Sequence, residues 1–207
     1  AASPPKYISN ATVTGDGPYE KIAQMMESAD RQFPGAVWSF SIGWGCDKLI
    51  TAADLAPVRA ALVRAQSHGT TAFDASGDLA GLECKGGQDW SAAPAADDVG
   101  LDSVASLPEM TDVGGTTLST DARGGWLAHG TGGGVSNLFD RPDFQRDVAT
   151  NRNQQQRLTP DVAAVADAFT GAKIVFDQQV LVGGGTSMSA PIWAGMTAVM
   201  NQYMLEN

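Results

Sequence analysis

Ser187 stands between three glycines and a predicted helix, in the stretch VGGGTSMSAPIWAGM (residues 182–196). Backbone N–H groups at such a strand-to-helix turn can face an incoming oxygen atom, and the N-terminus of a helix favours negative charge. This arrangement suits the oxyanion that forms when a serine attacks a carbonyl group. A bare Gly-Thr-Ser is also typical of an N-cap serine that performs no chemistry, so the rest of the chain must decide between nucleophile and cap.

Asp78 is the second candidate, because it follows a predicted strand directly in FDASGDLAG (residues 73–81). One interpretation is structural: the carboxylate accepts backbone N–H groups within its loop. The other is chemical. An ionised carboxylate would repel a developing oxyanion, so Asp78 can assist only as a protonated donor, a form that an acidic medium favours.

A serine nucleophile needs a general base, and the chain contains only two histidines. His68 falls at the end of a predicted surface helix, where it is expected to cap the last turn. His129 lies in AHGTGGGVSN, whose glycines disfavour a helix. A catalytic histidine is therefore not expected in this chain.

The elements that must position these residues alternate between helix and strand. Residues 19–33 and 55–69 have apolar side chains at helical spacing, and each is followed by a compact apolar run, at residues 36–42 and 70–76. Such alternation predicts an α/β layered fold with a mainly parallel central sheet flanked by helices. Further strands are expected at residues 110–118, 160–167, 173–176 and 180–183, and a last helix from about Ser189 to Met204, with Pro191 in its first turn. Functional residues are then expected at the carboxyl ends of the parallel strands.

Composition limits the possible functions. The 207 residues are 43% hydrophobic, which predicts a single domain over residues 1–207. The net charge of −10 and the pI near 4.4 argue against nucleic acid as a partner. No apolar run approaches the length of a membrane span, and residues 1–10 do not resemble a signal peptide. Cysteine count alone leaves open whether Cys46 and Cys84 form a disulfide or are separate thiols.

The stretch GTSMSAP resembles the nucleophile signature shared by two related protease groups, the subtilisins and the sedolisins, or serine-carboxyl peptidases. Subtilisins would have asparagine where Asp78 stands, whereas sedolisins have aspartate in a Ser-Gly-Asp motif. The stretches SFSIGWG, TDVGGTTL, GTGGGVSNLFDRPDFQ and TPDVAAVADAFTG also resemble sedolisin segments, in the same order. The resemblance covers most of residues 36–202 and implies a subtilisin-like fold.

For the site, the resemblance implies Ser187 as nucleophile, with Asp78 and the Ser187 N–H stabilising the oxyanion. It assigns the substrate-binding walls to the backbone of two segments, one formed by Gly43, Trp44 and Gly45, the other by Ala75, Ser76 and Gly77. Two departures are visible: Gly43 stands where the family often has serine, and residues 82–98 look like a variable loop. Alignment by motif also places Cys46 and Cys84 after neighbouring strands, which favours a disulfide between them and an extracytoplasmic protein.

The sedolisin mechanism also requires a glutamate base and an aspartate four residues later on one helix face. No such pair precedes Asp78: Asp16 and Glu20 have the reverse order, and Glu27 and Asp30 are three apart and are interpreted as solvated surface charge. The pair is expected within about ten residues upstream of Ala1, and the family's calcium site beyond Asn207. The chain thus looks like the middle of a catalytic domain, lacking the acidic-pair helix and the calcium-site region.

Three accounts of the missing pair remain open: a second chain supplies it after proteolytic processing, the sequence is a fragment, or the protein has lost catalysis. Residues 1–207 alone are expected to be nearly inactive, because a serine without a base is a poor nucleophile. The resemblance implies hydrolysis of peptide bonds at acidic pH through an acyl-enzyme, in a secreted or acidic compartment. The alternatives are a subtilisin-type protease fragment, active at neutral to alkaline pH, and a non-catalytic peptide-binding relative.

Overall fold

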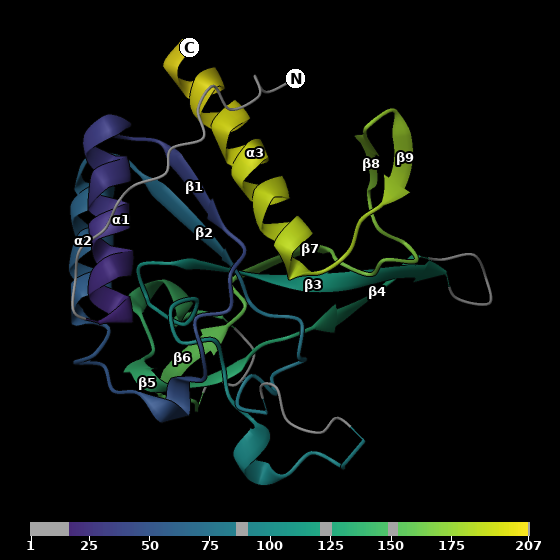
Figure 1. Cartoon of the computed structure of the whole chain (residues 1–207), viewed down its shortest axis with the longest axis horizontal. Helices are drawn as coiled ribbons and strands as arrows, with labels where there is room; N and C mark the ends of the chain where they lie inside the picture. Colours follow the sequence, from purple (N-terminus) through teal and green to yellow (C-terminus); the bar gives the residue numbers. More distant parts are fainter. Residues whose placement is uncertain (1–16, 86–90, 121–125, 149–152, 207) are drawn as a thin grey trace.

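A computed structural model describes residues 17–85, 91–120, 126–148 and 153–206, and for residues 120–131 it describes no side chains. Its centre is a sheet in which β1, β2, β3 and β7 run parallel in that order (Figure 1). These strands span Val37–Phe40, Thr71–Ala75, Thr111–Thr120 and Val162–Val165. The predicted α/β fold with a mainly parallel sheet is confirmed.

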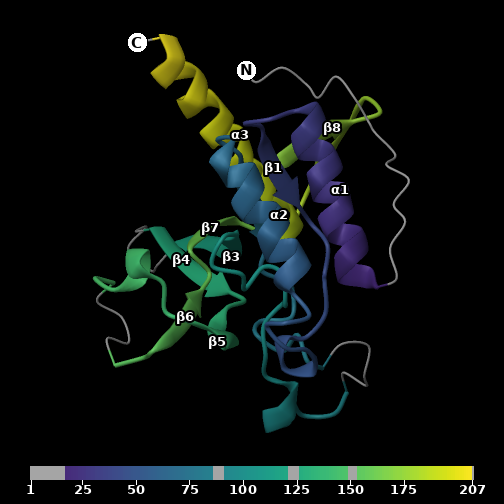
Figure 2. The same ribbon diagram turned by 90° about the vertical axis from the view of Figure 1, so that its left-hand side faces the viewer.

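Helices cover both faces of this sheet. α1 (Pro18–Gln32) and α2 (Ala56–Ser67) lie side by side on one face, and α3 (Thr186–Glu206) packs against β1, β2, β3 and β7 from the other (Figures 1 and 2). Among the described residues, no helix is both long and apolar enough to cross a membrane.

The side chains of β2 alternate between the two faces of the sheet, so this strand contributes to two apolar cores. Ala72 packs into the core beneath α1 and α2, whereas Phe73 and Ala75 pack with Ala190 of α3. Because successive side chains of a strand point to opposite faces, Asp74 must lie on the α1 and α2 side of the sheet. It is fully buried there, which no apolar pattern in the sequence predicted.

The antiparallel elements were not all foreseen. β4 (Trp126–Thr131) pairs antiparallel with the second half of β3, and β5 (Gly134–Asp140) pairs with β6 (Gln156–Thr159). β8 (Lys173–Phe176) and β9 (Gln179–Val182) were expected as strands, but they form a separate antiparallel hairpin instead of extending the parallel sheet (Figure 1).

Candidate active site

Three segments meet where the parallel strands end. They are residues 41–45 after β1, residues 76–78 after β2, and the first turn of α3. Two sets of hydrogen bonds join them: Ser41 Oγ donates to the Ser187 carbonyl oxygen over 3.0 Å, and Asp78 accepts from Thr186. The structure therefore brings Ser187 and Asp78, which are more than a hundred residues apart in sequence, to one place.

Asp78 is bonded to the residue that precedes Ser187. Its Oδ1 accepts from the Thr186 backbone N–H at 2.6 Å and from Thr186 Oγ1 at 2.9 Å. A Cβ at Gly185 would lie 2.8 Å from Asp78 Oδ2, and Gly185 has φ +85°, so this position requires glycine on two grounds. Because Oδ1 already accepts two hydrogen bonds, Oδ2 is the oxygen left for another partner or a proton.

α3 begins earlier than its sequence predicted. The expected start near Ser189 placed Pro191 in the first turn, but the helix starts at Thr186, so Pro191 lies in the second turn. Pro191 has no N–H to donate to the carbonyl oxygen of Ser187 four residues back. The hydroxyl of Ser41 donates to that oxygen instead, and this bond compensates for the proline.

The two serines at the start of α3 have different surroundings. Ser189 is fully buried, and its Oγ donates to the carbonyl oxygens of Ala164 and Val165, which ties α3 to β7. Ser187 is exposed. Among the described residues, none forms a hydrogen bond with Ser187 Oγ.

Residues 43–45 form an open edge beside this serine. Gly43 and Gly45 are exposed, and a Cβ added to either would meet no atom within 4 Å. Gly45 has φ +100°, which favours glycine. Between them, half-buried Trp44 turns its ring into the core beneath α1 and α2. The backbone here has free space on its outer side.

The second expected wall is more enclosed. Ala75 and Ser76 are each 5% exposed, and the Ser76 N–H donates to the Val113 carbonyl oxygen. Only their backbone and that of Gly77, which has φ +96°, can contribute to a surface. Glu83, which sequence reasoning missed, is half-buried beneath this turn, and its carboxyl accepts from the Leu79 N–H. Burial and the nearby Asp78 charge raise the pKa of Glu83. Glu83 belongs to no sequence motif, so the sequence contained no signal that could have identified it.

A pocket of about 320 Å³ opens next to Asp78. It is lined by residues of β3, of the loops after β2 and β7, and of the glycine turn before α3: Asp78, Ala80, Thr117, Ala166, Asp167 and Gly185. Because Asp78 and Gly185 line it, the pocket is a place near the start of α3 where part of a bound molecule can lie.

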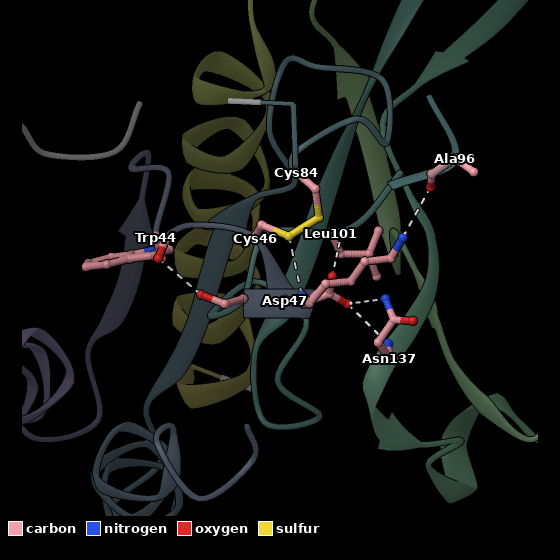
Figure 3. Close-up of a disulfide and its surroundings, with 9 residues drawn as sticks. Trp44, Cys46, Asp47, Cys84, Ala96, Leu101 and Asn137 are labelled. Carbon is pink, nitrogen blue, oxygen red and sulfur yellow. Dashed lines mark hydrogen bonds between the residues drawn. A yellow bond between two sulfur atoms is a disulfide. The ribbon is translucent and has the colours of Figure 1, made fainter. Parts of the chain in front are cut away.

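The two cysteines lie in the loops that follow β1 and β2 and are joined in a disulfide, with their Cα atoms 4.7 Å apart (Figure 3). Asp47, next to Cys46, is fully buried. One of its carboxylate oxygens accepts from the Leu101 N–H and the other from the N–H and Nδ2 of Asn137 (Figure 3). The loop after β1 is thus fixed to two other parts of the chain.

One cluster of potential metal ligands in the described part of the chain can be compared with what calcium requires. It consists of Cys46, Asp47 and Cys84. Its sulfur atoms are joined to each other, and both oxygens of Asp47 accept hydrogen bonds from the protein. Calcium prefers six to eight oxygen ligands, which this cluster does not provide.

The other sequence candidates lie elsewhere. His68 caps the end of α2, and its Nδ1 is 2.8 Å from Asp30 Oδ2 on α1. Asp30 is only 5% exposed, so its interpretation as solvated surface charge was wrong: it packs between two helices with a histidine partner. Glu27 does pair at the surface, with Arg64 and Arg31. Asp16 and the side chain of His129 lie outside the described part of the chain.

Helices on both faces of a mainly parallel sheet, with an exposed serine at the start of the helix that packs on its centre, are the arrangement expected of a subtilisin-like fold. Sequence similarity to known proteins identifies the family within this class. Kumamolisin of Bacillus sp. (strain MN-32) is 33% identical over 179 residues, which are 79% of this chain and 31% of the relative. Tripeptidyl-peptidase 1 of Bos taurus is 30% identical over 72% of this chain and 27% of its own length.

The structural comparison agrees. Pseudomonas sedolisin, described as a serine-carboxyl proteinase and solved with two molecules of pseudo-iodotyrostatin, matches with a TM-score of 0.67 and 27% identity. The match covers 87% of this chain and 52% of that one. No protein-family model matches the chain. The chain belongs to the sedolisin family, as predicted, and it spans about a third of the length of the curated relatives.

Proposed function

We propose that this chain carries the nucleophile and the oxyanion site of a serine-carboxyl peptidase that hydrolyses peptide bonds at acidic pH. The observation that carries the proposal is the pair of hydrogen bonds from Thr186 to Asp78 Oδ1, because they hold a carboxyl group beside Ser187. Membership of a family whose relatives include kumamolisin and sedolisin supports it.

In the proposed reaction, Ser187 Oγ forms a bond to the peptide carbonyl carbon and loses its proton to a base. Asp78, protonated on Oδ2, and the Ser187 N–H donate to the oxyanion. The C–N bond then breaks, and the departing amine takes the proton from the base. A water molecule then attacks the acyl carbon and gives its proton to the base. The bond from the acyl carbon to Ser187 Oγ breaks, and Oγ takes the proton back from the base.

The base is proposed to come from outside residues 1–207, as the glutamate of a Glu-x-x-x-Asp pair. Either the same polypeptide or a second chain could supply it. The exposed Ser187 side chain is accessible to such a group. Family resemblance also suggests a structural calcium ion whose ligands lie beyond these residues, and residues 1–207 are proposed to form one domain.

The substrate is proposed to be a peptide or protein whose backbone lies along residues 43–45 and the turn at residues 76–77. The open space outside Gly43 and Gly45 supports this placement. The pocket beside Asp78 would receive a substrate side chain. The disulfide and the acidic composition support a secreted or acidic extracytoplasmic location.

Peptide hydrolysis from about pH 3 to pH 8 tests the proposal, measured on the protein as its source produces it, with whatever segments accompany residues 1–207. We expect turnover only on the acidic side, a fall of about 10⁴-fold or more in kcat for Ser187→Ala, and little change for the exposed control Ser67→Ala. Activity confined to neutral or alkaline pH would indicate the subtilisin alternative. Peptide binding without turnover at any pH would indicate a non-catalytic relative.

A further inference from the structure

Residues 100–103 lie between the two loops that the proposed function uses to bind substrate. The backbone pairing of β1 with β2 ends at Phe40 and Asp74, and beyond that point the loop after each strand bonds to residues 100–103. This segment belongs to no helix or strand, yet all four of its residues are buried. We call residues 100–103 the spacer segment.

Backbone hydrogen bonds join the spacer segment to both loops. On the side of the loop after β1, the Ser103 N–H donates to the Gly45 carbonyl oxygen at 2.8 Å. On the side of the loop after β2, the Gly100 N–H donates to the Gly81 carbonyl oxygen at 2.9 Å, and the Gly100 carbonyl oxygen accepts from the Glu83 N–H. The spacer segment is thus bonded along both of its edges, as a central strand of a sheet is.

The disulfide between Cys46 and Cys84 joins the same two loops covalently and lies against Gly100 (Figure 3). A Cβ added to Gly100 would overlap Cys84 Sγ and lie 3.5 Å from Cys46 Sγ. It would also lie 3.0 Å from Asp47 Oδ1. Gly100 is not among the glycines with a positive φ, so its backbone conformation would accept alanine. Glycine is required at this position for space, above all for the Cys84 sulfur atom.

The two loops differ in their freedom to move away from the spacer segment. The loop after β2 is packed from behind, because a Cβ at Gly81 would lie 2.8 Å from the Gly133 carbonyl oxygen. The loop after β1 is open on its outer side, since a Cβ at Gly43 or Gly45 would meet no atom within 4 Å. A thicker spacer segment would therefore displace the loop after β1.

We propose that the spacer segment and the disulfide against it set the separation of the two substrate-binding segments, residues 43–45 and 76–77, and that Gly100 is the positioning residue for this separation. A peptide that bonds to both segments requires one fixed separation, because N–H···O distances fall within about 2.7–3.2 Å. The role in substrate binding rests on the proposed function; the spacing of the two loops does not.

The first test compares two substrates in Gly100→Ala, using the protein as its source produces it. One is a peptide long enough to lie along both segments, and the other is p-nitrophenyl acetate, which can acylate a serine without reaching them. The bonds from Thr186 to Asp78 do not involve the spacer segment. We therefore expect kcat/KM to fall by about tenfold or more for the peptide and to stay within about twofold for the ester.

The second test asks whether the disulfide is what Gly100 accommodates, and it needs no substrate. Hydrogen exchange of the amides of residues 100 and 103 reports the bonds on both edges of the spacer segment. Gly100→Ala should lower their protection by about tenfold or more when the disulfide is present. In the background of Cys46→Ala with Cys84→Ala, the Cβ enters the space that the sulfur atoms leave, and the same substitution should lower protection by about threefold or less.

Gly195→Ala is the matched control for both tests. A Cβ at this helical glycine would meet no atom within 4 Å, so the variant should behave as wild type. Equal losses for the peptide and the ester in Gly100→Ala would indicate general damage and would overturn the proposal. Protection that falls equally with and without the disulfide, or a Gly100→Ala variant that behaves like the control, would overturn it as well.

If Gly100→Ala does not fold, the variant with Cys46→Ala and Cys84→Ala alone provides the remaining test. Without the disulfide, kcat/KM should fall by about threefold or more for the peptide and remain unchanged for the ester. An unchanged value for the peptide would count against the proposal. The exchange measurements do not depend on hydrolysis by Ser187, so failure here and failure of the proposed function are distinguishable.

Discussion

Ser187 is held through its backbone, and no residue in the described part of the chain bonds to its hydroxyl. Pro191 leaves the Ser187 carbonyl oxygen without a helical donor, and Ser41 supplies one from the end of the neighbouring segment. One residue earlier, Thr186 donates twice to Asp78. The hydroxyl of Ser187 is thereby positioned by its neighbours without being used by them, as a nucleophile requires.

Ser41→Ala should therefore lower stability and kcat more than the exposure of Ser41 indicates. Losing the hydrogen bond should lower the free energy of unfolding by about 0.5–1.5 kcal/mol, because the Ser187 carbonyl then has only water as a donor. Urea unfolding measures this, and peptide hydrolysis should show a lower kcat. Ser39→Ala, at the exposed position of the otherwise half-buried β1, is the matched control. Equal behaviour of the two variants would show that the Ser41 bond has no influence.

Asp78 permits a sharper comparison. Asp78→Ala removes the proposed oxyanion donor and should lower kcat by about 10²–10³-fold. Asp78→Asn should lose less, because its oxygen can accept from Thr186 while its amide nitrogen donates from the Oδ2 position. The measurement is kcat of both variants at the optimal pH. An asparagine variant as impaired as the alanine variant would contradict the donor role.

At the scale of elements, one buried ion pair joins the small β5–β6 sheet to the central sheet. Arg157 on β6 is fully buried and bonds to Asp161, whose Oδ2 also accepts the Asp112 N–H at the start of β3. The Arg157 guanidinium also donates to the backbone oxygens of Ser106 and Met110. One side chain thus fixes the segment before β3 to β6.

Arg157→Met should destabilise the fold by about 3–5 kcal/mol, because it leaves the Asp161 charge and two backbone acceptors without their partner. Arg31→Met removes an exposed pair with Glu27 and should cost less than about 1 kcal/mol. Thermal or urea unfolding compares them. A loss at Arg157 no larger than at Arg31 would show that the buried pair does not join the two sheets energetically.

The whole molecule combines an acidic composition with buried acids, and this predicts the pH dependence of its stability. Burial raises the pKa values of Asp74, Asp102 and Asp112 in the folded state. An unfolded aspartate has a pKa near 3.9, so between about pH 4 and pH 7 the folded state binds more protons than the unfolded state. The free energy of unfolding must then fall as the pH rises through this window.

Each such group contributes a slope of about −1.4 kcal/mol per pH unit within its window. Urea unfolding at about pH 4, 5.5 and 7 should show the midpoint decreasing with pH, and Asp102→Asn should make the decrease shallower. Stability that rises from pH 4 to pH 7 would mean that these carboxyl groups are ionised in the folded protein.

Sequence reasoning recovered the parts of the molecule that local pattern controls. Helical spacing predicted the bounds of α1 and α2 to within a residue or two. The order of the motifs predicted that Ser187 and Asp78 belong to one site. The start of α3 was misplaced because Pro191 favours a first turn, and only a tertiary hydrogen bond from Ser41 makes the second turn acceptable. Asp30 and Asp74 were missed as buried groups, because a charged residue reveals its partner only when the chain has folded.

The most direct test of the central claim is to trap the acyl-enzyme. The protein as its source produces it would be mixed with a peptide ester at about pH 4, quenched within the first turnover, digested and mapped by mass spectrometry. The account predicts an acyl adduct on the peptide that contains Ser187, absent in Ser187→Ala and absent at neutral pH. Rapid ester or peptide hydrolysis with no adduct on Ser187, or with undiminished turnover in Ser187→Ala, would contradict it.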